Sequence, residues 1–228
     1  METRISLTVF TPREAERITG VSTVMQRDWR RHGYLPVNEG HMRFNVFGLA
    51  ELLALRLLAE RRIGPQQGKL VSDWLAAGIT RFALQSRRAY EGDAAEIQDL
   101  PEDTSRAAMR AALENAAAKA APGNTFNLSG APISWLAGAN RLSRMVLKAH
   151  DTPKGIGRAL PARFFLWFSD DTHTWHESVD KCFEEEGVAD GLLAGPIVVL
   201  DQHAIGEHLL KMAGRPFVYV EDVPEAEE

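Results

Sequence analysis

The sequence predicts a mainly α-helical fold whose C-terminal part is α+β. Apolar residues at helical spacing, bounded by clear start and stop residues, fill the first 80 residues. Near the C-terminus, short apolar segments typical of strands alternate with helical patterns. Of the 228 residues, 45% are hydrophobic and 25% are charged, which is the composition of a globular protein and excludes a disordered chain.

The composition excludes several other classes of protein. No run of 18 apolar residues occurs, so no membrane-spanning helix is expected. The N-terminus has no apolar run like that of a signal peptide. The single cysteine, Cys182, excludes an internal disulfide and a Cys-x-x-Cys metal site. We therefore expect a cytoplasmic protein.

Charge is distributed unevenly along the chain. The net charge is -5 at pH 7, yet residues 1–70 contain 11 Lys and Arg against 7 Asp and Glu. The acidic excess lies in the remaining residues. A basic N-terminal third on an acidic body is typical of a protein that meets a polyanion only with its N-terminal part.

Two short helices are predicted close to the N-terminus. Residues Thr11–Glu14 form a capping box with Pro at the first helical position, and Gly20 ends that helix. Ser22 can cap a second helix over 23–32, which Gly33 closes. Two helices joined by a tight turn that contains Gly are typical of a helix-turn-helix.

The second helix divides into an apolar and a polar side. Val24, Met25 and Trp29 are expected to face the core, and Trp29 in particular because indole favours burial. The polar side chains are expected to face outwards and to offer donors to phosphates and base edges. They are Thr23, Gln26, Arg27, Arg30 and Arg31. The alternative is an ordinary solvated surface helix.

A small hairpin and two further helices are predicted next. Turn-forming residues between short apolar stretches predict the hairpin over 34–44. Asn45 can cap an amphipathic helix over 46–62. A further helix is predicted over 66–77, where Gly78 is expected to stop it.

A set of residues within 8–78 matches a known pattern. It comprises Gly20-Val21-Ser22 at the turn, Arg27 with Trp29 two residues on, Gly33-Tyr34-Leu35-Pro36, Arg43-Phe44, and then Leu49, Leu52 and Gly64. As a set, these residues resemble the winged helix-turn-helix domain of the MerR family of bacterial transcription regulators. The order Arg-x-Trp-Arg-Arg is closer to the divergent, excisionase-like members of that family.

The resemblance implies DNA binding. The second helix would enter the major groove, and the hairpin would be a wing that presses a neighbouring phosphate or the minor groove. Arg27 and Arg43 match positions that hold the DNA backbone in the family, and we assign Thr23 and Gln26 to base edges. The candidate DNA-binding residues are Thr23, Gln26, Arg27, Arg30, Arg31, His41 and Arg43.

The rest of the chain predicts a second domain. The expected organisation is a DNA-binding domain at 1–80, a polar linker at 81–103, an α+β effector or oligomerisation domain at 104–222 and an acidic tail at 223–228. Helices are predicted at 104–121, 132–150, 173–187 and 202–213. Strands at 163–169, 197–200 and 217–220 would form one three-stranded sheet with helices packed on it.

Candidate chemistry in the C-terminal part is sparse. Asp171, His173 and His176 could offer metal ligands, with the two histidines on one helix face. The favoured interpretation is a loop and a helix N-terminus. Asp201, His203 and His208 form a weaker set. No phosphate-binding loop or nucleophile motif occurs, so neither an enzyme nor a cofactor is expected.

These observations predict a transcription regulator that binds double-stranded DNA. A homodimer on symmetric half-sites is expected, because one short helix reads too few bases for a genome. The C-terminal domain would receive a small-molecule or protein effector. Two alternatives remain: an architectural protein of the recombination directionality type, and a regulator that acts through protein contacts of its C-terminal domain.

Overall fold

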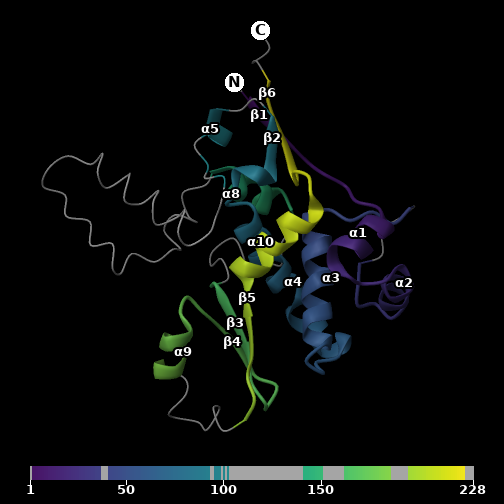
Figure 1. The fold of residues 1–228 in the computed structure, drawn as a ribbon, viewed down its shortest axis with the longest axis vertical. Coiled ribbons are helices and arrows are strands. Elements are labelled where there is room, and N and C mark those ends of the chain that lie inside the picture. The colour runs from purple at the N-terminus through teal and green to yellow at the C-terminus, as the bar shows by residue number, and fades with distance from the viewer. Residues whose placement is uncertain are drawn as a thin grey trace, which may run out of the picture.

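The protein has a mixed α+β fold in a computed structural model (Figure 1). The structure describes residues 2–36, 41–92, 95–98, 100, 102, 141–150, 162–185 and 195–223. The helix predicted at 104–121, residues 132–140 of the next predicted helix, the hairpin tip at 37–40 and all but the first residue of the tail lie outside these ranges.

The elements follow the chain in this order. The helices are α1 (Pro12–Thr19), α2 (Thr23–Arg31), α3 (Val46–Ala59), α4 (Pro65–Ala83), the 3-10 turn η1 (Arg87–Ala89), α5 (Ala95–Gln98), α8 (Arg141–Ala149), α9 (Val179–Glu185) and α10 (Gln202–Ala213). The strands are β1 (Glu2–Leu7), β2 (Tyr90–Gly92), β3 (Phe164–Trp167), β4 (His173–His176), β5 (Val198–Asp201) and β6 (Val218–Val223).

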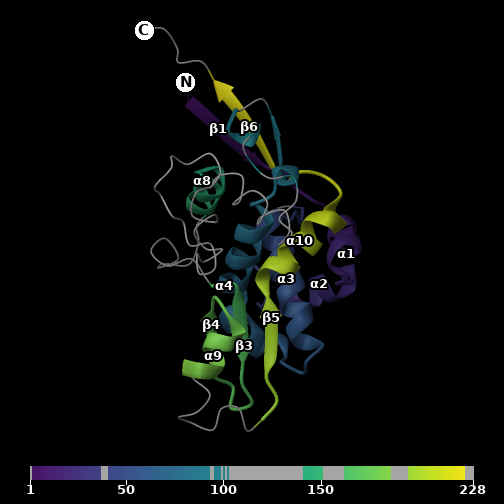
Figure 2. The same ribbon diagram turned by 60° about the vertical axis from the view of Figure 1, so that its left-hand side comes forward.

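The C-terminal strand is the centre of the first sheet, whose order is β1-β6-β2. β1 pairs antiparallel with β6, from Glu2 opposite Val223 to Leu7 opposite Val218. β2 pairs with β6 in parallel. Figure 2 shows β1 and β6 side by side. The strand predicted at 217–220 is present, whereas β1 and β2 were not predicted.

The second sheet has the order β4-β3-β5 and is antiparallel throughout. The strands predicted at 163–169 and 197–200 are confirmed as β3 and β5. The helix predicted over 173–187 is wrong in its first part, because residues 173–176 form β4 and pair with β3. The predicted single sheet is also wrong, since β6 belongs to the other one.

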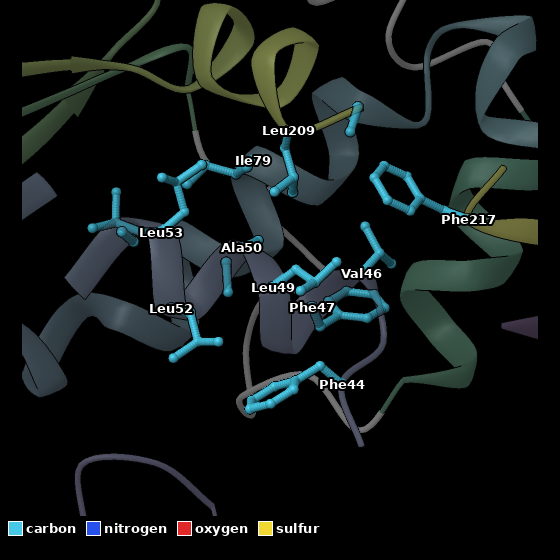
Figure 3. Packing of buried hydrophobic residues seen from close by; sticks show 14 of the residues in the cluster. Phe44, Val46, Phe47, Leu49, Ala50, Leu52, Leu53, Ile79, Leu209 and Phe217 are labelled. Carbon is cyan, nitrogen blue, oxygen red and sulfur yellow. The ribbon is translucent and has the colours of Figure 1, made fainter. Parts of the chain in front are cut away.

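The helix α3 lies in the middle of the hydrophobic core (Figure 3). It is buried on nearly all sides, as expected for a helix enclosed by other elements. Core residues around it come from both ends of the chain and include Ile79, Leu209 and Phe217. Elements on both sides of residue 80 therefore share one core.

Two glycines allow α4 and α10 to pack closely. A Cβ on Gly206 would lie 2.7 Å from the carbonyl oxygen of Ile79 and 2.8 Å from the backbone nitrogen of Ala83. A Cβ on Gly78 would overlap the side-chain amide of Gln202. The predicted stop at Gly78 is wrong, because α4 continues to Ala83 and this glycine serves packing instead.

The first part of the predicted linker at 81–103 belongs to the fold. Gln85, Ser86, Ala89 and Tyr90 are buried. The Tyr90 hydroxyl donates a hydrogen bond of 2.9 Å to the carbonyl oxygen of Leu84. This bond satisfies the Tyr90 hydroxyl in the core, as is usual for a buried polar group.

Candidate nucleic-acid interface

The pair α1–α2 is defined by caps at both helix starts. The Glu14 carboxylate accepts from the backbone N–H of Thr11 at 2.7 Å, and the Thr11 hydroxyl accepts from the backbone N–H of Glu14 at 3.3 Å. The Thr11 backbone N–H, together with the Thr11 hydroxyl that donates to the same carboxylate oxygen at 2.8 Å, lowers the pKa of Glu14. Gly20 ends α1 with φ +73°, and the Ser22 hydroxyl accepts from the N–H of Met25. The predicted capping box, turn glycine and second cap are confirmed.

Gln26 fixes the turn between the two helices. Its side chain is 0% exposed, and its amide Nε2 donates to the carbonyl oxygens of Pro12 at 3.0 Å and Val21 at 2.8 Å. The prediction that Gln26 contacts base edges is therefore wrong. Its amide satisfies backbone acceptors that burial would otherwise leave unpaired.

A second set of contacts holds the turn from α3. The Arg56 guanidinium donates from Nη1 to the carbonyl oxygen of Thr19 at 2.7 Å, and its Nε pairs with Glu60 at 2.8 Å. A Cβ on Gly20 would overlap this guanidinium, so the glycine is needed for space as well as for its φ. The Glu16 carboxylate accepts from the backbone N–H of Thr23, at the start of α2. Sequence reasoning missed Arg56, because its partner lies 37 residues away.

The outward face of α2 differs from the predicted one. Trp29 is 6% exposed, as expected for a core residue. Val24 and Met25, predicted to face inwards, are 71% and 44% exposed. The buried residues of α2 are Gln26 and Trp29, which lie three residues apart on one face of the helix. This face differs from the one that Val24 and Met25 were predicted to form.

Two of the predicted arginines lie on this outward face. Arg27 is exposed, and the side chain of Arg31 is 75% exposed. Arg31 forms an ion pair of 2.6 Å with Asp28, whose carboxylate lies 3.5 Å from His32. Exposed pairs of this kind are weak, so both guanidinium groups remain open to an anionic partner.

Arg30 has a different position. It is half-buried, and its Nε is buried without a hydrogen-bond partner among the described residues. It lines a cavity of about 520 Å³ that lies between α2, residues 42–48 and α4. Arg30 is therefore not equivalent to Arg27 and Arg31.

The segment after the predicted hairpin tip is tied to the chain before α1. Phe10 and Phe44 exchange two backbone hydrogen bonds of 2.7 Å and 2.9 Å in an antiparallel bridge. Both rings are buried. His41 and Arg43 are exposed, and Arg43 donates only a long bond of 3.4 Å to the carbonyl oxygen of Met42. Both predicted residues are thus available on the surface.

The first candidate metal set does not converge. The Asp171 carboxylate accepts from Gln67 and from the Trp167 indole, at 3.3 Å each. The His173 ring stacks on Trp167, and burial lowers the pKa of His173. His173 and His176 lie on a strand three residues apart and face opposite sides of it, so the expectation of a shared helix face is wrong.

The second candidate set has structural roles. Asp201 pairs with Arg163, and its carboxylate caps α10 by accepting from two backbone N–H groups. The pairing lowers the pKa of Asp201. His203 is buried against Phe82, whereas His208 is exposed. Within the part of the chain that the structure describes, no group of three His, Cys, Asp or Glu could hold a metal ion.

A buried carboxylate forms part of the cavity wall. Glu51 on α3 accepts from Lys69 Nζ at 2.7 Å and from the Ser72 hydroxyl at 3.0 Å. Lys69 also pairs with Asp73 at 3.0 Å. Burial raises the pKa of Glu51, because desolvation of the carboxylate outweighs the bonds from Lys69 and Ser72.

This burial predicts a pH-dependent effect of Glu51→Gln. The folded protein binds the Glu51 proton more tightly than the unfolded chain, so the contribution of Glu51 to stability decreases as pH rises through the raised pKa. Glutamine does not titrate. The Tm of the variant relative to wild type should therefore increase as pH rises from the ordinary glutamate pKa through the raised pKa of Glu51. The control is Glu91→Gln on β2, which is exposed. A Tm difference that stays constant with pH would contradict the direction of the shift.

The comparisons with known proteins found no match. This holds for protein-family models, for curated proteins and for solved structures. Among the described residues, no helix has both the length and the apolar character that crossing a lipid bilayer requires.

Proposed function

We propose that the protein is a DNA-binding transcription regulator whose α1–α2 pair acts as a winged helix-turn-helix of the MerR type. The observation that carries the proposal is the outward face of α2. It presents Arg27 and Arg31 to solvent, and the helix is held by the buried contacts of Gln26 and Trp29. A helix fixed on one side and cationic on the other suits insertion into the major groove.

In this proposal, the exposed arginines of α2 and the half-buried Thr23 have different roles. Arg27 and Arg31 contact phosphates, and Thr23 lies at the helix N-terminus, where helix-turn-helix proteins contact base edges. Arg43 and His41 contact the DNA backbone beside the groove. The protein acts as a homodimer on two half-sites, because a single α2 offers too few base contacts to select one genomic site.

The proposal is tested by binding of duplex DNA recovered in a genomic pull-down. Arg27→Ala and Arg43→Ala should each lower affinity for every duplex and reduce the slope of log K against log salt by about 1, because each removes one phosphate contact. Fluorescence anisotropy at several salt concentrations measures both quantities.

The matched control is Arg144→Ala. Arg144 is an exposed arginine on α8 and is not one of the residues of the candidate DNA interface. Its loss should leave affinity and salt slope unchanged. The proposal fails if Arg27→Ala and Arg43→Ala bind DNA like the wild type.

A further inference from the structure

The cavity beside α2 is enclosed by several elements. It holds about 520 Å³, which lies within the size range of small-molecule sites. Its walls come from the end of α2, from residues 42–48 at the start of α3, and from α4, with His150 beyond the end of α8.

Two of its cations have no acidic partner among the described residues. Arg30 keeps a buried Nε–H without an acceptor among these residues, and the Arg43 guanidinium donates a long bond of 3.4 Å to the carbonyl oxygen of Met42. The third cation, Lys69, is shared between Glu51 and Asp73. Arg30 is half-buried and lines the cavity, so an anion that contacts its guanidinium would gain a charge-assisted hydrogen bond.

Apart from the charged residues and Asn45, the wall is largely apolar and aromatic, and its two carboxylates, Glu51 and Asp73, are both bonded to Lys69. The Phe47 ring stacks on His150 with centroids 3.7 Å apart. Leu35, Phe44 and Ala76 add apolar surface. Such a wall favours a ligand with a flat or apolar body and disfavours a small hydrated ion.

We propose that this cavity binds a small organic anion, with a carboxylate or a comparable oxyanion on Arg30 and Arg43 and an aromatic or apolar body against the part of the wall formed by Phe47 and His150. Arg30 belongs to α2, and Arg43 belongs to the segment that leads into α3. The bound anion therefore bridges the two parts of the candidate DNA interface. This coupling to DNA rests on the proposed function, whereas binding of the anion does not.

The bridge gives the anion a way to change DNA affinity. Arg43 is a proposed phosphate contact, and an anion that occupies its guanidinium removes that contact. We expect the anion to weaken DNA binding, and DNA to weaken anion binding by the same factor.

The direct test uses the fluorescent aromatic anion 8-anilinonaphthalene-1-sulfonate on the full chain. The dye should bind saturably, with one molecule per chain. Benzoate should displace it, whereas benzyl alcohol, of similar shape but neutral, should not. Displacement by both compounds alike, or the absence of saturable binding, would overturn the proposal.

Variants locate the site. Arg30→Gln and Arg43→Gln should each weaken dye binding about tenfold, the value of one charge-assisted hydrogen bond. Arg31→Gln is the matched control, since Arg31 lies next to Arg30 in sequence but is 75% exposed and paired with Asp28. Circular dichroism confirms the fold of each variant, and Arg43 is exposed, so its replacement leaves the core intact. Equal dye affinity in wild type, Arg30→Gln and Arg43→Gln would refute the assignment of the anion site to this cavity.

Adding benzoate to the DNA titration separates the two proposals. Loss of DNA affinity with benzoate in the wild type, but not in Arg30→Gln, supports the coupling. Dye binding that depends on Arg30 in a protein that binds no DNA would retain the cavity site and refute the proposed function. DNA binding in a protein that does not bind the dye would retain the proposed function and refute the cavity site.

Discussion

Replacing Trp29 with Ala is expected to lower the free energy of unfolding by about 3–5 kcal/mol, the usual cost of removing a large buried aromatic side chain. Trp29 is 6% exposed and belongs to the main hydrophobic cluster. At about 2–4 °C per kcal/mol for a chain of this size, Tm should fall by at least about 6 °C. Thermal unfolding of the full chain, followed by circular dichroism, measures this change.

Met25→Ala provides the control for Trp29→Ala. Met25 lies on the same helix, one turn before Trp29, and is 44% exposed. Its replacement should change stability by no more than about 0.5 kcal/mol, as is usual for surface positions. Equal losses in the two variants would mean that the helix as a whole, rather than the buried indole, determines the result.

Replacing Gly206 with Leu is expected to destabilise the protein by about 3 kcal/mol. The added side chain would overpack the contact between α4 and α10, where no neighbouring side chain can move aside to make room. The atoms that a Cβ would meet are backbone atoms of Ile79 and Ala83 on α4. The two helices must separate to admit a larger residue. Chemical denaturation of the full chain measures the loss as a lower midpoint.

Ala204→Leu is the matched control for the crossing. Ala204 lies two residues before Gly206 on α10 and is exposed. Leucine and alanine have similar helix propensities, so the midpoint denaturant concentration of this variant should be close to that of the wild type. A Gly206→Leu variant as stable as Ala204→Leu would show that α4 and α10 can move apart at little cost.

Local signals in the sequence predicted much of the helical structure. The caps at Thr11, Ser22 and Asn45 each mark the start of a helix that is present. The helix predicted over 202–213 has the same bounds as α10, because Asp201 caps it and Gly214 ends it with φ +69°. These signals involve only residues close together in the sequence, so the helix bounds can be predicted from them without knowledge of the tertiary structure.

Errors occurred where distant residues determine the structure. Gln26 has the character of a surface residue, and the carbonyl oxygens of Pro12 and Val21 in the folded turn make it a buried donor. Gly78 stops no helix, because Gln202 from the other end of the chain packs against it. The cavity was not predicted at all, since its walls join residues from 30 to 150.

The central position of β6 constrains the order of events during synthesis. Leu7 on β1 pairs with Val218, so β1 cannot complete its pairing until β6, far along the chain, has left the ribosome. At about 5–20 residues per second, this wait is on the order of 10–40 s. Throughout that time β1 and β2 lack the strand that separates them in the sheet, and their unpaired edges are open to pairing with other chains. A ribosome stalled before β6 would present an aggregation-prone nascent chain, although the helices from α1 to α4 would already have emerged.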